Sequence, residues 1–327
     1  MKVCIIGTTS WGTTLAVMLA RRGIDVSLWT RTEKEAQRLT HDGQNKARLP
    51  GIAFPKGLRA VSDIGEALRD VSLVILAVPS QTMRQNVQAI KGDLSSGVPV
   101  LSAAKGFEKD SAKRMSQVIE EELGSGHSAH IGVLSGPNLS REIAKGLPAA
   151  TVIAAKNGNA SEGARDIIHS QSFHVYTSDD VVGVELGGAL KNIVALGAGM
   201  VDGLGYGDNA KAAYMSHGLT EIASLGVALG AKPLTFLGLA GLGDLLATCE
   251  STLSRNHTLG VGLAKGRSLS ELMASIGSAV EGVPTTAAAL KLARQLEVKM
   301  PITERIYQVL YEGLSPKQAM AELIGEI

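Results

Sequence analysis

The sequence has few of the residues that mark disulfide scaffolds, metal clusters or membrane spans. Its two cysteines, Cys4 and Cys249, lie far apart and outside any Cys-x-x-Cys motif, so neither a disulfide framework nor a cysteine metal site is expected. We expect both thiols to be buried and reduced. No apolar run approaches the length of a membrane span. No signal peptide is expected either, because the chain enters its first predicted strand at once.

An excess of charge of either sign is also missing. The chain has 32 Lys and Arg residues against 31 Asp and Glu residues, and the basic residues are spread along it. Proteins that bind nucleic acid usually carry a basic patch, so no nucleic-acid partner is expected. With no membrane span and no signal peptide, the sequence predicts a cytoplasmic protein.

Glycine and small apolar residues are abundant, whereas aromatic residues make up only 3% of the chain. Of 327 residues, 45% are hydrophobic and 38 are glycine. This length exceeds the usual size of one domain, so two domains are expected. The composition suits a sheet of Val, Ile and Leu covered by closely packed helices that are rich in Ala and Gly.

The order of the predicted elements indicates an open sheet followed by helices. Strands and helices alternate up to about residue 177, which favours a mostly parallel sheet. Strands are predicted at 2–6, 23–29, 73–78, 99–102, 131–135, 151–155 and 173–177. Beyond these, helices are predicted at 181–201, 209–229, 239–250, 253–265, 283–296 and 302–310. We therefore predict an α/β, doubly wound, Rossmann-like domain in residues 1–178 and an all-helical substrate domain in residues 179–327.

The first 31 residues follow the plan of a nucleotide-binding βαβ unit. Gly7 and Gly12 flank a turn between a strand and a helix, and the start of such a helix favours an anion. Thr9 stands where the G-x-G-x-x-G pattern has its second glycine, so a Cβ lies near the expected pyrophosphate. We expect the Thr9 hydroxyl to compensate by donating to a phosphate oxygen. The alternative is that the glycines only make a tight turn.

The residue that follows the second predicted strand bears on cofactor choice. An acid there accepts from the ribose hydroxyls of NAD, whereas an arginine accommodates the 2′-phosphate of NADP. The segment reads Thr30-Arg31-Thr32-Glu33, with Arg31 nearest the strand. We interpret this as tolerance of NADP, with NAD also usable. A solvated loop arginine is the alternative.

Two lysines and one turn further along the chain could take part in chemistry. Lys105 and the turn Ser135-Gly136-Pro137-Asn138 follow strands, where ligands of open α/β sheets bind. Lys191 lies in an apolar helical pattern with no carboxylate until Asp202. Such a lysine must reach solvent, pair with an acid or do chemistry.

A further segment offers an anion site. Ser254, Arg255 and Asn256 combine a hydroxyl, a guanidinium and an amide at a predicted helix start, which fits a phosphate or a carboxylate. Asp244, after Gly241-Leu-Gly, could hold a catalytic lysine in place. An N-cap with a surface arginine is the alternative interpretation of the first three residues.

Together these segments resemble the bacterial NAD(P)-dependent glycerol-3-phosphate dehydrogenases over essentially the full length. The family's glycine turn usually has glycine where Thr9 stands, and generally Ser or Thr where Asn138 stands. The motifs that carry the resemblance are Gly7-Thr-Thr-Ser-Trp-Gly12, Ala104-Lys-Gly-Phe107, Ser135-Gly-Pro137, Glu185-Leu-Gly-Gly-Ala-Leu-Lys-Asn192, Gly241-Leu-Gly-Asp244, Leu253-Ser-Arg-Asn256 and Val280-Glu-Gly282.

The resemblance implies an oxidoreductase that interconverts dihydroxyacetone phosphate and sn-glycerol 3-phosphate with NADPH or NADH and no metal. It implies that Lys191 donates and accepts the proton, that Asp244 positions Lys191, and that Lys105 and Asn192 orient the substrate. The implied substrate contacts are Lys105, Gly136, Asn138, Lys191, Asp244, Ser254, Arg255 and Asn256. The implied cofactor contacts are Gly7, Thr9, Ser10, Trp11, Gly12, Arg31, Lys105, Ser140, Arg255, Val280 and Glu281.

The expected partner is thus a small phosphorylated substrate, and the product would supply phospholipid synthesis. A homodimer is left open. Two other functions remain as alternatives. A β-hydroxy acid dehydrogenase of the same layout could use Arg255 for a carboxylate, and a dinucleotide sensor without turnover is suggested by Thr9. Against the sensor stands the set of Lys191, Asp244 and Arg255, which a sensor would not require.

Overall fold

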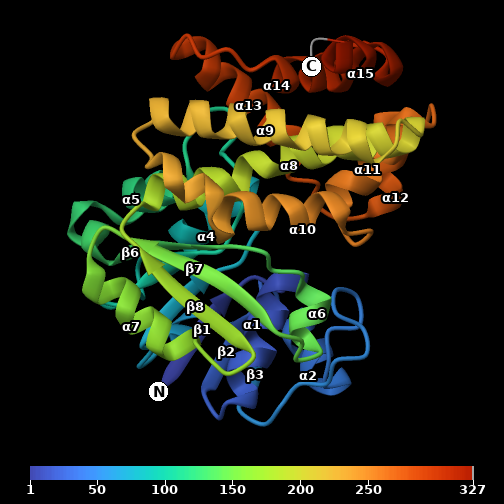
Figure 1. Ribbon diagram of the computed structural model, residues 1–327. Helices are drawn as coiled ribbons and strands as arrows, with labels where there is room; N and C mark the ends of the chain where they lie inside the picture. The colour runs from blue at the N-terminus through green and yellow to red at the C-terminus, as the bar shows by residue number, and fades with distance from the viewer. Residues whose placement is uncertain (326–327) are drawn as a thin grey trace. The chain divides into compact units, whose positions relative to one another are not determined.

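The computed structural model describes residues 1–325 and divides the chain into two compact units (Figure 1). Unit 1 comprises residues 1–104, 115–134 and 138–181, and unit 2 comprises 105–114, 135–137 and 182–327. Two short segments from the first half of the chain therefore belong with the carboxy-terminal helices. The single domain boundary predicted after residue 178 does not account for these two segments.

Unit 1 is built on an eight-stranded sheet in the order β3-β2-β1-β4-β5-β6-β7-β8. Neighbouring strands from β3 through β6 run parallel, as do β7 and β8. The order steps outward from β1 in both directions, which is the doubly wound plan. The strands are β1 (Lys2–Ile6), β2 (Asp25–Trp29), β3 (Leu58–Val61), β4 (Leu73–Leu76), β5 (Val100–Ser102), β6 (Ile131–Ser135), β7 (Ala149–Ala155) and β8 (Phe173–Ser178).

Helices cover both faces of the central part of this sheet, so the side chains of β4, β5 and β6 are buried throughout. In β1, Val3 and Ile5 join one apolar cluster with α1, α2, α6 and α7, whereas Cys4 and Ile6 join a second cluster with α3, α4 and α5. The helices of unit 1 are α1 (Ser10–Arg21), α2 (Glu33–Asp42), α3 (Ile64–Leu68), α4 (Met83–Ile90), α5 (Met115–Leu123), α6 (Ser140–Ala144) and α7 (Gly158–Ile168), with short 3-10 turns at Ser80–Thr82 and Ser125–His130.

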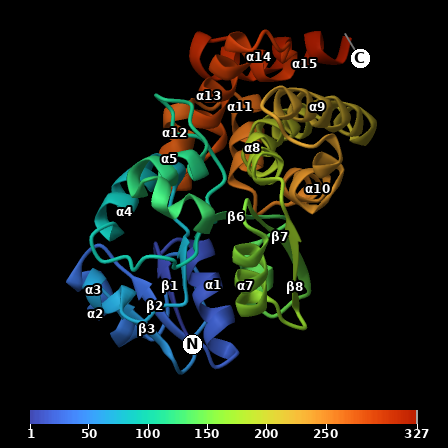
Figure 2. The ribbon, with the colours of Figure 1, turned by 90° about the vertical axis from the view of Figure 1, so that its left-hand side faces the viewer.

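From residue 182 onward, the described part of unit 2 has helices and no strands, and it packs around α8, which runs from Val181 to Leu204. Both ribbon views show α8 among α9, α10 and α11, with α14 and α15 ending the chain (Figure 2). The remaining elements are α9 (Asp208–Ala228), α10 (Asp244–Glu250), α11 (Arg255–Ala264), α12 (Leu269–Ile276), α13 (Gly282–Gln295), α14 (Pro301–Tyr307) and α15 (Pro316–Gly325), with 3-10 or π turns at Pro233–Leu237, Leu239–Gly243 and Gln308–Glu312.

Helix α8 is, among the described residues, the one helix long and apolar enough to cross a membrane. However, 94% of its most apolar window is buried inside the structure, as in the core helix of a globular unit. Glycines let neighbours approach it closely. A Cβ on Gly188 would collide with the Ser135 side chain, and one on Gly187 with the carbonyl of Ala240. The segments that bring Lys105 and Gly136 into unit 2 can therefore pack directly on the α8 backbone.

Candidate active site

Lys191 is buried in unit 2 and paired with an acid. It lies on α8 with 5% of its surface exposed, so it does not reach solvent as one sequence-based alternative allowed. Its Nζ donates to Oδ1 of Asp244 and to Oγ1 of Thr248, the latter at 2.6 Å. Burial lowers the pKa of Lys191 to about 8; the charge of Asp244 opposes this shift and that of Lys105 adds to it. An ammonium with such a pKa can release and regain its proton near neutral pH.

Asp244 is shared by two lysines. The Nζ of Lys105 lies 2.6 Å from the second carboxylate oxygen of Asp244, and it also donates to the carbonyl of Gly136 at 2.7 Å. Asp244 is 1% exposed, and a buried charge of this kind is retained only where it is paired and hydrogen-bonded. One carboxylate thus holds two ammonium groups side by side, as the prediction that Asp244 positions Lys191 requires.

Thr248 completes this cluster and was not predicted from the sequence. It follows Asp244 by four residues on α10, which places both side chains on the same helical face. Its hydroxyl accepts from Lys191 and donates to the carbonyl of Asp244 at 2.6 Å. The spacing Asp-x-x-x-Thr could have indicated Thr248. A residue four positions after Asp244 on a helix lies beside Asp244, and therefore also beside Lys191, the predicted partner of Asp244.

Two buried asparagines connect the cluster to the start of α11. Asn192 donates to the carbonyl of Lys105 at 3.0 Å, and its Oδ1 accepts from Asn256 at 2.8 Å. The Oδ1 of Asn256 in turn accepts from the backbone of Gly282 at 2.9 Å. Asn256 therefore ties α8, α11 and the start of α13 together, while its predicted contact with substrate phosphate stays a prediction.

Ser254 is the N-cap of α11, as the alternative interpretation of that segment held. Its hydroxyl accepts from the backbone of His257 at 3.3 Å. Arg255, the first residue of the helix, is exposed. The arrangement presents a guanidinium at a helix N-terminus, where the dipole also favours an anion. Val280 and Glu281, predicted to contact the cofactor, lie just before α13 in the same unit.

In unit 1, the residues of the glycine turn form a cradle at the start of α1. Gly7 has a φ of +111°, a conformation that side chains rarely adopt, and a Cβ on Gly12 would collide with the carbonyl of Gly7. The first backbone amides of α1 have no partner within the helix. Trp11, the second residue of α1, has a buried indole N–H without a hydrogen-bond partner among the described residues. These features fit the pyrophosphate of a dinucleotide.

The predicted role of the Thr9 hydroxyl is wrong. Its single proton is donated to the carbonyl of Ala77 at 2.7 Å, and its oxygen accepts from the backbone of Gly12 at 3.0 Å. Thr9 is the N-cap of α1, so its hydroxyl has no proton left for a phosphate. The glycine pattern indicated a phosphate contact for Thr9. Its position one residue before a helix, where threonine is a favoured N-cap, was the stronger indication.

The other predicted residues of unit 1 are spread over several elements. Arg31 is exposed between β2 and α2. Ser10 donates to the carbonyl of Arg48 at 2.7 Å, and the carbonyl of Ser140 accepts from Thr14 at 3.1 Å. Asn138 accepts from Thr151 at 3.1 Å, which commits the carbonyl oxygen of its amide to its own unit.

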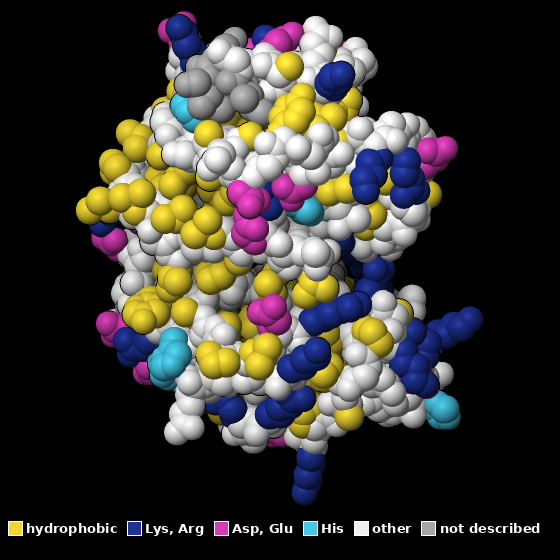
Figure 3. Space-filling view, turned by 45° about the vertical axis from the view of Figure 1, so that its right-hand side comes forward, with side chains coloured by type: hydrophobic (Ala, Val, Ile, Leu, Met, Phe, Trp, Pro, Cys, Tyr) yellow, Lys and Arg dark blue, Asp and Glu magenta, His cyan; other side chains and the backbone are white. Residues whose placement is uncertain are grey.

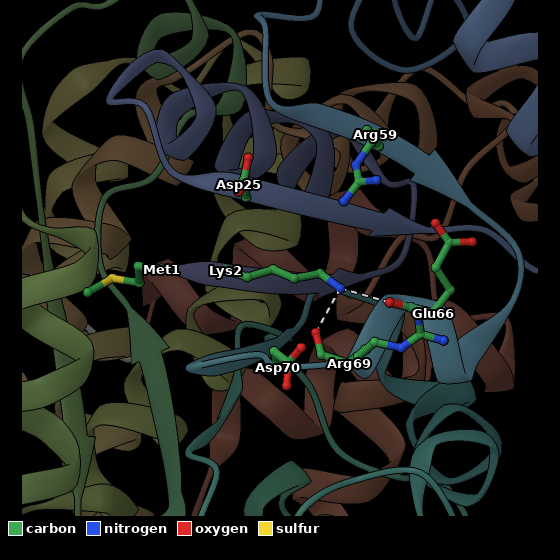
Figure 4. A pocket seen from close by; sticks show the side chains of 7 residues that line it. All are labelled: Met1, Lys2, Asp25, Arg59, Glu66, Arg69 and Asp70. Carbon is green, nitrogen blue, oxygen red and sulfur yellow. Dashed lines mark hydrogen bonds between the residues drawn. The ribbon is translucent and has the colours of Figure 1, made fainter.

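A charged cavity of about 410 Å³ lies elsewhere in unit 1, at the amino ends of β1 and β2 (Figure 4). Its Lys2 ammonium donates to the carbonyls of Glu66 and Arg69 at 2.7 and 2.9 Å, as the dashed lines show. Ligands of open α/β sheets bind beyond the carboxyl ends of the strands, so this cavity is not the nucleotide site. No group of His, Cys, Asp and Glu within residues 1–325 could hold a metal ion.

Comparisons with known proteins agree with this geometry. The family model for the N-terminus of NAD-dependent glycerol-3-phosphate dehydrogenase matches residues 2–161, and that for the C-terminus matches residues 180–321. The chain belongs to the NAD-dependent glycerol-3-phosphate dehydrogenase family. It is an NAD(P)-dependent oxidoreductase, and the resemblance seen in its motifs is confirmed.

Members of this family match the chain over nearly its whole length. The glycerol-3-phosphate dehydrogenase [NAD(P)+] of Dehalococcoides mccartyi is 52% identical over 325 residues, which cover 99% of this chain and 90% of that protein. The enzyme of the same name from Moorella thermoacetica is 47% identical, covering 99% and 95%. The crystal structure of glycerol-3-phosphate dehydrogenase from Coxiella burnetii has a TM-score of 0.94 at 36% identity, covering 99% and 98%.

Proposed function

We propose that this chain interconverts dihydroxyacetone phosphate and sn-glycerol 3-phosphate, with Lys191 as the group that gives and takes the proton. The observation that carries the proposal is the cluster of Lys191, Asp244, Thr248 and Lys105. It combines a buried ammonium with a pKa of about 8 and a second ammonium on the same carboxylate. Family membership supplies the reaction class and argues against the β-hydroxy acid alternative.

The chemistry follows from where the protons and charges are. When bound, the nicotinamide exchanges a hydride with the carbon that carries the substrate carbonyl. Reduction places negative charge on the carbonyl oxygen, and the Lys191 ammonium can neutralise that charge by donating its proton there. In oxidation, neutral Lys191 removes the proton from the hydroxyl. Asp244 and Thr248 keep Nζ in one position through both directions.

The second cation supports the same oxygen. Because Lys105 shares Asp244 with Lys191, its ammonium keeps positive charge beside the cluster after Lys191 has lost its proton. Asn192 accepts from Asn256 and donates to the backbone of Lys105, so it fixes the segment that carries Lys105. These contacts support the roles of Lys105 and Asn192 in orienting substrate.

Arg255 and the N-terminus of α11 are the proposed phosphate site. A guanidinium binds phosphate oxygens in pairs, and the helix dipole adds a favourable field. Replacing Arg255 by alanine should raise KM for dihydroxyacetone phosphate by about 10-fold or more, since hydrogen bonds to charged groups contribute roughly 1.5–3 kcal/mol. Dihydroxyacetone, which lacks the phosphate, should lose little. Equal losses for both substrates would refute the phosphate site.

The decisive assay follows NADH and NADPH oxidation by the purified protein with dihydroxyacetone phosphate. Turnover with at least one cofactor is expected, together with very poor turnover of dihydroxyacetone. No turnover with either cofactor would support the alternative of a dinucleotide sensor. We further propose that the enzyme works in the cytoplasm, as a homodimer, and supplies glycerol 3-phosphate for phospholipids; sedimentation at working concentration tests the dimer.

A further inference from the structure

Three hydroxyl side chains follow Gly7 in the glycine turn, and each donates to a different part of unit 1. Thr9 and Ser10 donate to backbone carbonyls, those of Ala77 and Arg48. Thr8 differs, because its hydroxyl donates to a carboxylate, Oε1 of Glu35, at 2.8 Å. Glu35 lies in the first turn of α2, 27 residues further along the chain. Thr8, which follows Gly7 in the glycine turn, is therefore linked to an acid on α2.

Local helix chemistry does not account for this direction of Glu35. An acid in the first turn of a helix is stabilised by the dipole even when it faces solvent. Glu33, in the same turn, bonds instead with Ser62 and Gln37, away from the nucleotide turn. The Glu35 side chain is only 28% exposed, and its ion pair with Arg38 is long, at 3.8 Å. Its short hydrogen bond is the one to Thr8.

The stretch of chain around Glu35 carries more cations than acids. Figure 3 shows Lys and Arg side chains gathered at the lower right of the face in view. In the stretch from the end of β2 through α2 and the loop that follows, the acids are Glu33, Glu35 and Asp42, and the exposed cations are Arg31, Lys34, Arg38, Lys46, Arg48 and Lys56. A carboxylate held within such a stretch subtracts from its attraction for an additional phosphate.

In a βαβ unit the adenosine ribose lies beyond the carboxyl end of the second strand, next to the glycine turn. Charged residues by that edge include Arg31, directly after β2, and Glu35, through its bond to Thr8; Glu33 is also there but is bonded to Ser62, after β3. We propose that Glu35 is a specificity-determining residue for the cofactor, whose negative charge opposes the 2′-phosphate of NADPH that Arg31 attracts. Through Thr8 it also fixes the start of the turn for either cofactor. This inference rests on the NAD(P) dependence of the family to which the chain belongs.

The charge and the anchoring contact can be separated by substitution. Glu35→Gln keeps an acceptor for the Thr8 hydroxyl but removes the charge. Thr8→Val keeps the shape of the side chain but removes the hydroxyl. Glu33→Gln is the matched control, because it removes the same charge from the same helical turn without touching Thr8. Arg31→Asp tests the opposing charge.

The experiment titrates the full-length protein with NADH and with NADPH, without substrate. Glu35→Gln should shift the ratio of the two dissociation constants toward NADPH by about five-fold or more at low salt, and by less at high salt. Arg31→Asp should shift the ratio toward NADH. Thr8→Val should weaken both cofactors by a similar factor, and Glu33→Gln should leave the ratio within about two-fold.

A ratio that changes no more in Glu35→Gln than in Glu33→Gln would overturn the specificity role. Unchanged binding of both cofactors by Thr8→Val would overturn the anchoring role. Because the titration needs no turnover, its result is independent of the proposed reaction. A protein that shows the predicted shift yet never reduces dihydroxyacetone phosphate would contradict the proposed function and leave this inference standing.

Discussion

At the scale of single residues, the buried Lys191 ammonium is the group on which the proposed chemistry depends. Replacing Lys191 by alanine should lower kcat by about 10²–10⁴-fold or more, the usual contribution of a general acid, while NADH binding changes little. Asp244 would keep Lys105 as its partner, so the variant should fold. Steady-state kinetics and an NADH titration measure the two effects.

Two further variants are compared with Lys191→Ala. Lys191→Met fills more of the space of the lysine, and Lys317→Ala removes an exposed lysine from α15 without touching the cluster. Lys317→Ala should behave as the unaltered protein. If Lys191→Ala retains a kcat within about ten-fold of the unaltered enzyme, Lys191 is not the proton donor.

The pKa of Lys191 fixes the direction of the pH dependence. Reduction needs the ammonium, so kcat/KM for dihydroxyacetone phosphate should fall as the pH rises through about 8, whereas oxidation of glycerol 3-phosphate should rise. Since Asp244 raises this pKa, Asp244→Asn should move both the fall for reduction and the rise for oxidation to lower pH. The pH profiles of kcat/KM in both directions test this, and profiles that Asp244→Asn leaves unshifted would contradict it.

The same shift affects stability with a definite sign. The folded pKa of about 8 lies below the ordinary 10.5, so the unfolded chain binds more protons between these values. The contribution of Lys191 to the free energy of unfolding therefore increases as the pH rises from about 8 to about 10.5.

At the scale of elements, the start of α1 depends on Thr9. Thr9→Gly removes the cap and the bond to Ala77 and adds freedom to the unfolded chain, so it should cost about 1 kcal/mol of unfolding free energy. Thr9→Ser keeps the hydroxyl and should cost less than about 0.5 kcal/mol. Urea unfolding of the two variants gives both numbers. A glycine variant as stable as the parent would show that the cap contributes nothing.

The start of α14 depends in the same way on Glu221, a buried residue of α9. Its carboxylate accepts from the backbone of Ile302 and from the backbone and hydroxyl of Thr303. Glu221→Ala leaves two buried amides without that acceptor and should cost about 1–3 kcal/mol of unfolding free energy per unsatisfied group. Glu304→Ala, on the exposed face of α14, is the control and should change stability by less than about 0.5 kcal/mol.

If the Glu221 and Glu304 variants unfold at the same urea concentration, the carboxylate does not hold α14. Burial raises the pKa of Glu221 to about 7, against the hydrogen bonds from Ile302 and Thr303, which lower it. The group thus binds a proton more readily in the folded chain. Its contribution to stability is complete below its ordinary pKa of 4.5 and is lost as the pH rises through about 7.

At the scale of the whole molecule, the predictions from sequence were strongest where the apolar pattern was continuous. The seven predicted strands are present, and burial on both faces explains the continuous apolar runs of β1, β4 and β6. The strand Leu58–Val61 was missed because the exposed Arg59 interrupts its apolar run. Helix α2 was missed because Ala36 and Leu39 are its only buried residues.

The candidate site was predictable by residue type but not by pairing. Lys191, Asp244 and Lys105 were each singled out from their place in a motif, yet no pattern shows that one carboxylate holds both lysines. Asp244 lies 139 residues after Lys105 and 53 residues after Lys191 in the sequence, so both contacts are long-range. The Thr9 error has the same origin, because the carbonyl of Ala77 that takes its proton lies 68 residues away.

The two short segments that join unit 2 have a consequence for biosynthesis. Lys105 leaves the ribosome 139 residues before Asp244, the acid that it shares with Lys191. At the usual rate of synthesis, that interval lasts about 7 to 28 s. Throughout it, the nascent chain can already fold the strands from β1 to β5, but the residues of the lysine cluster cannot meet. A chain that ends before Asp244 therefore has the residues of the glycine turn but cannot form the complete lysine cluster.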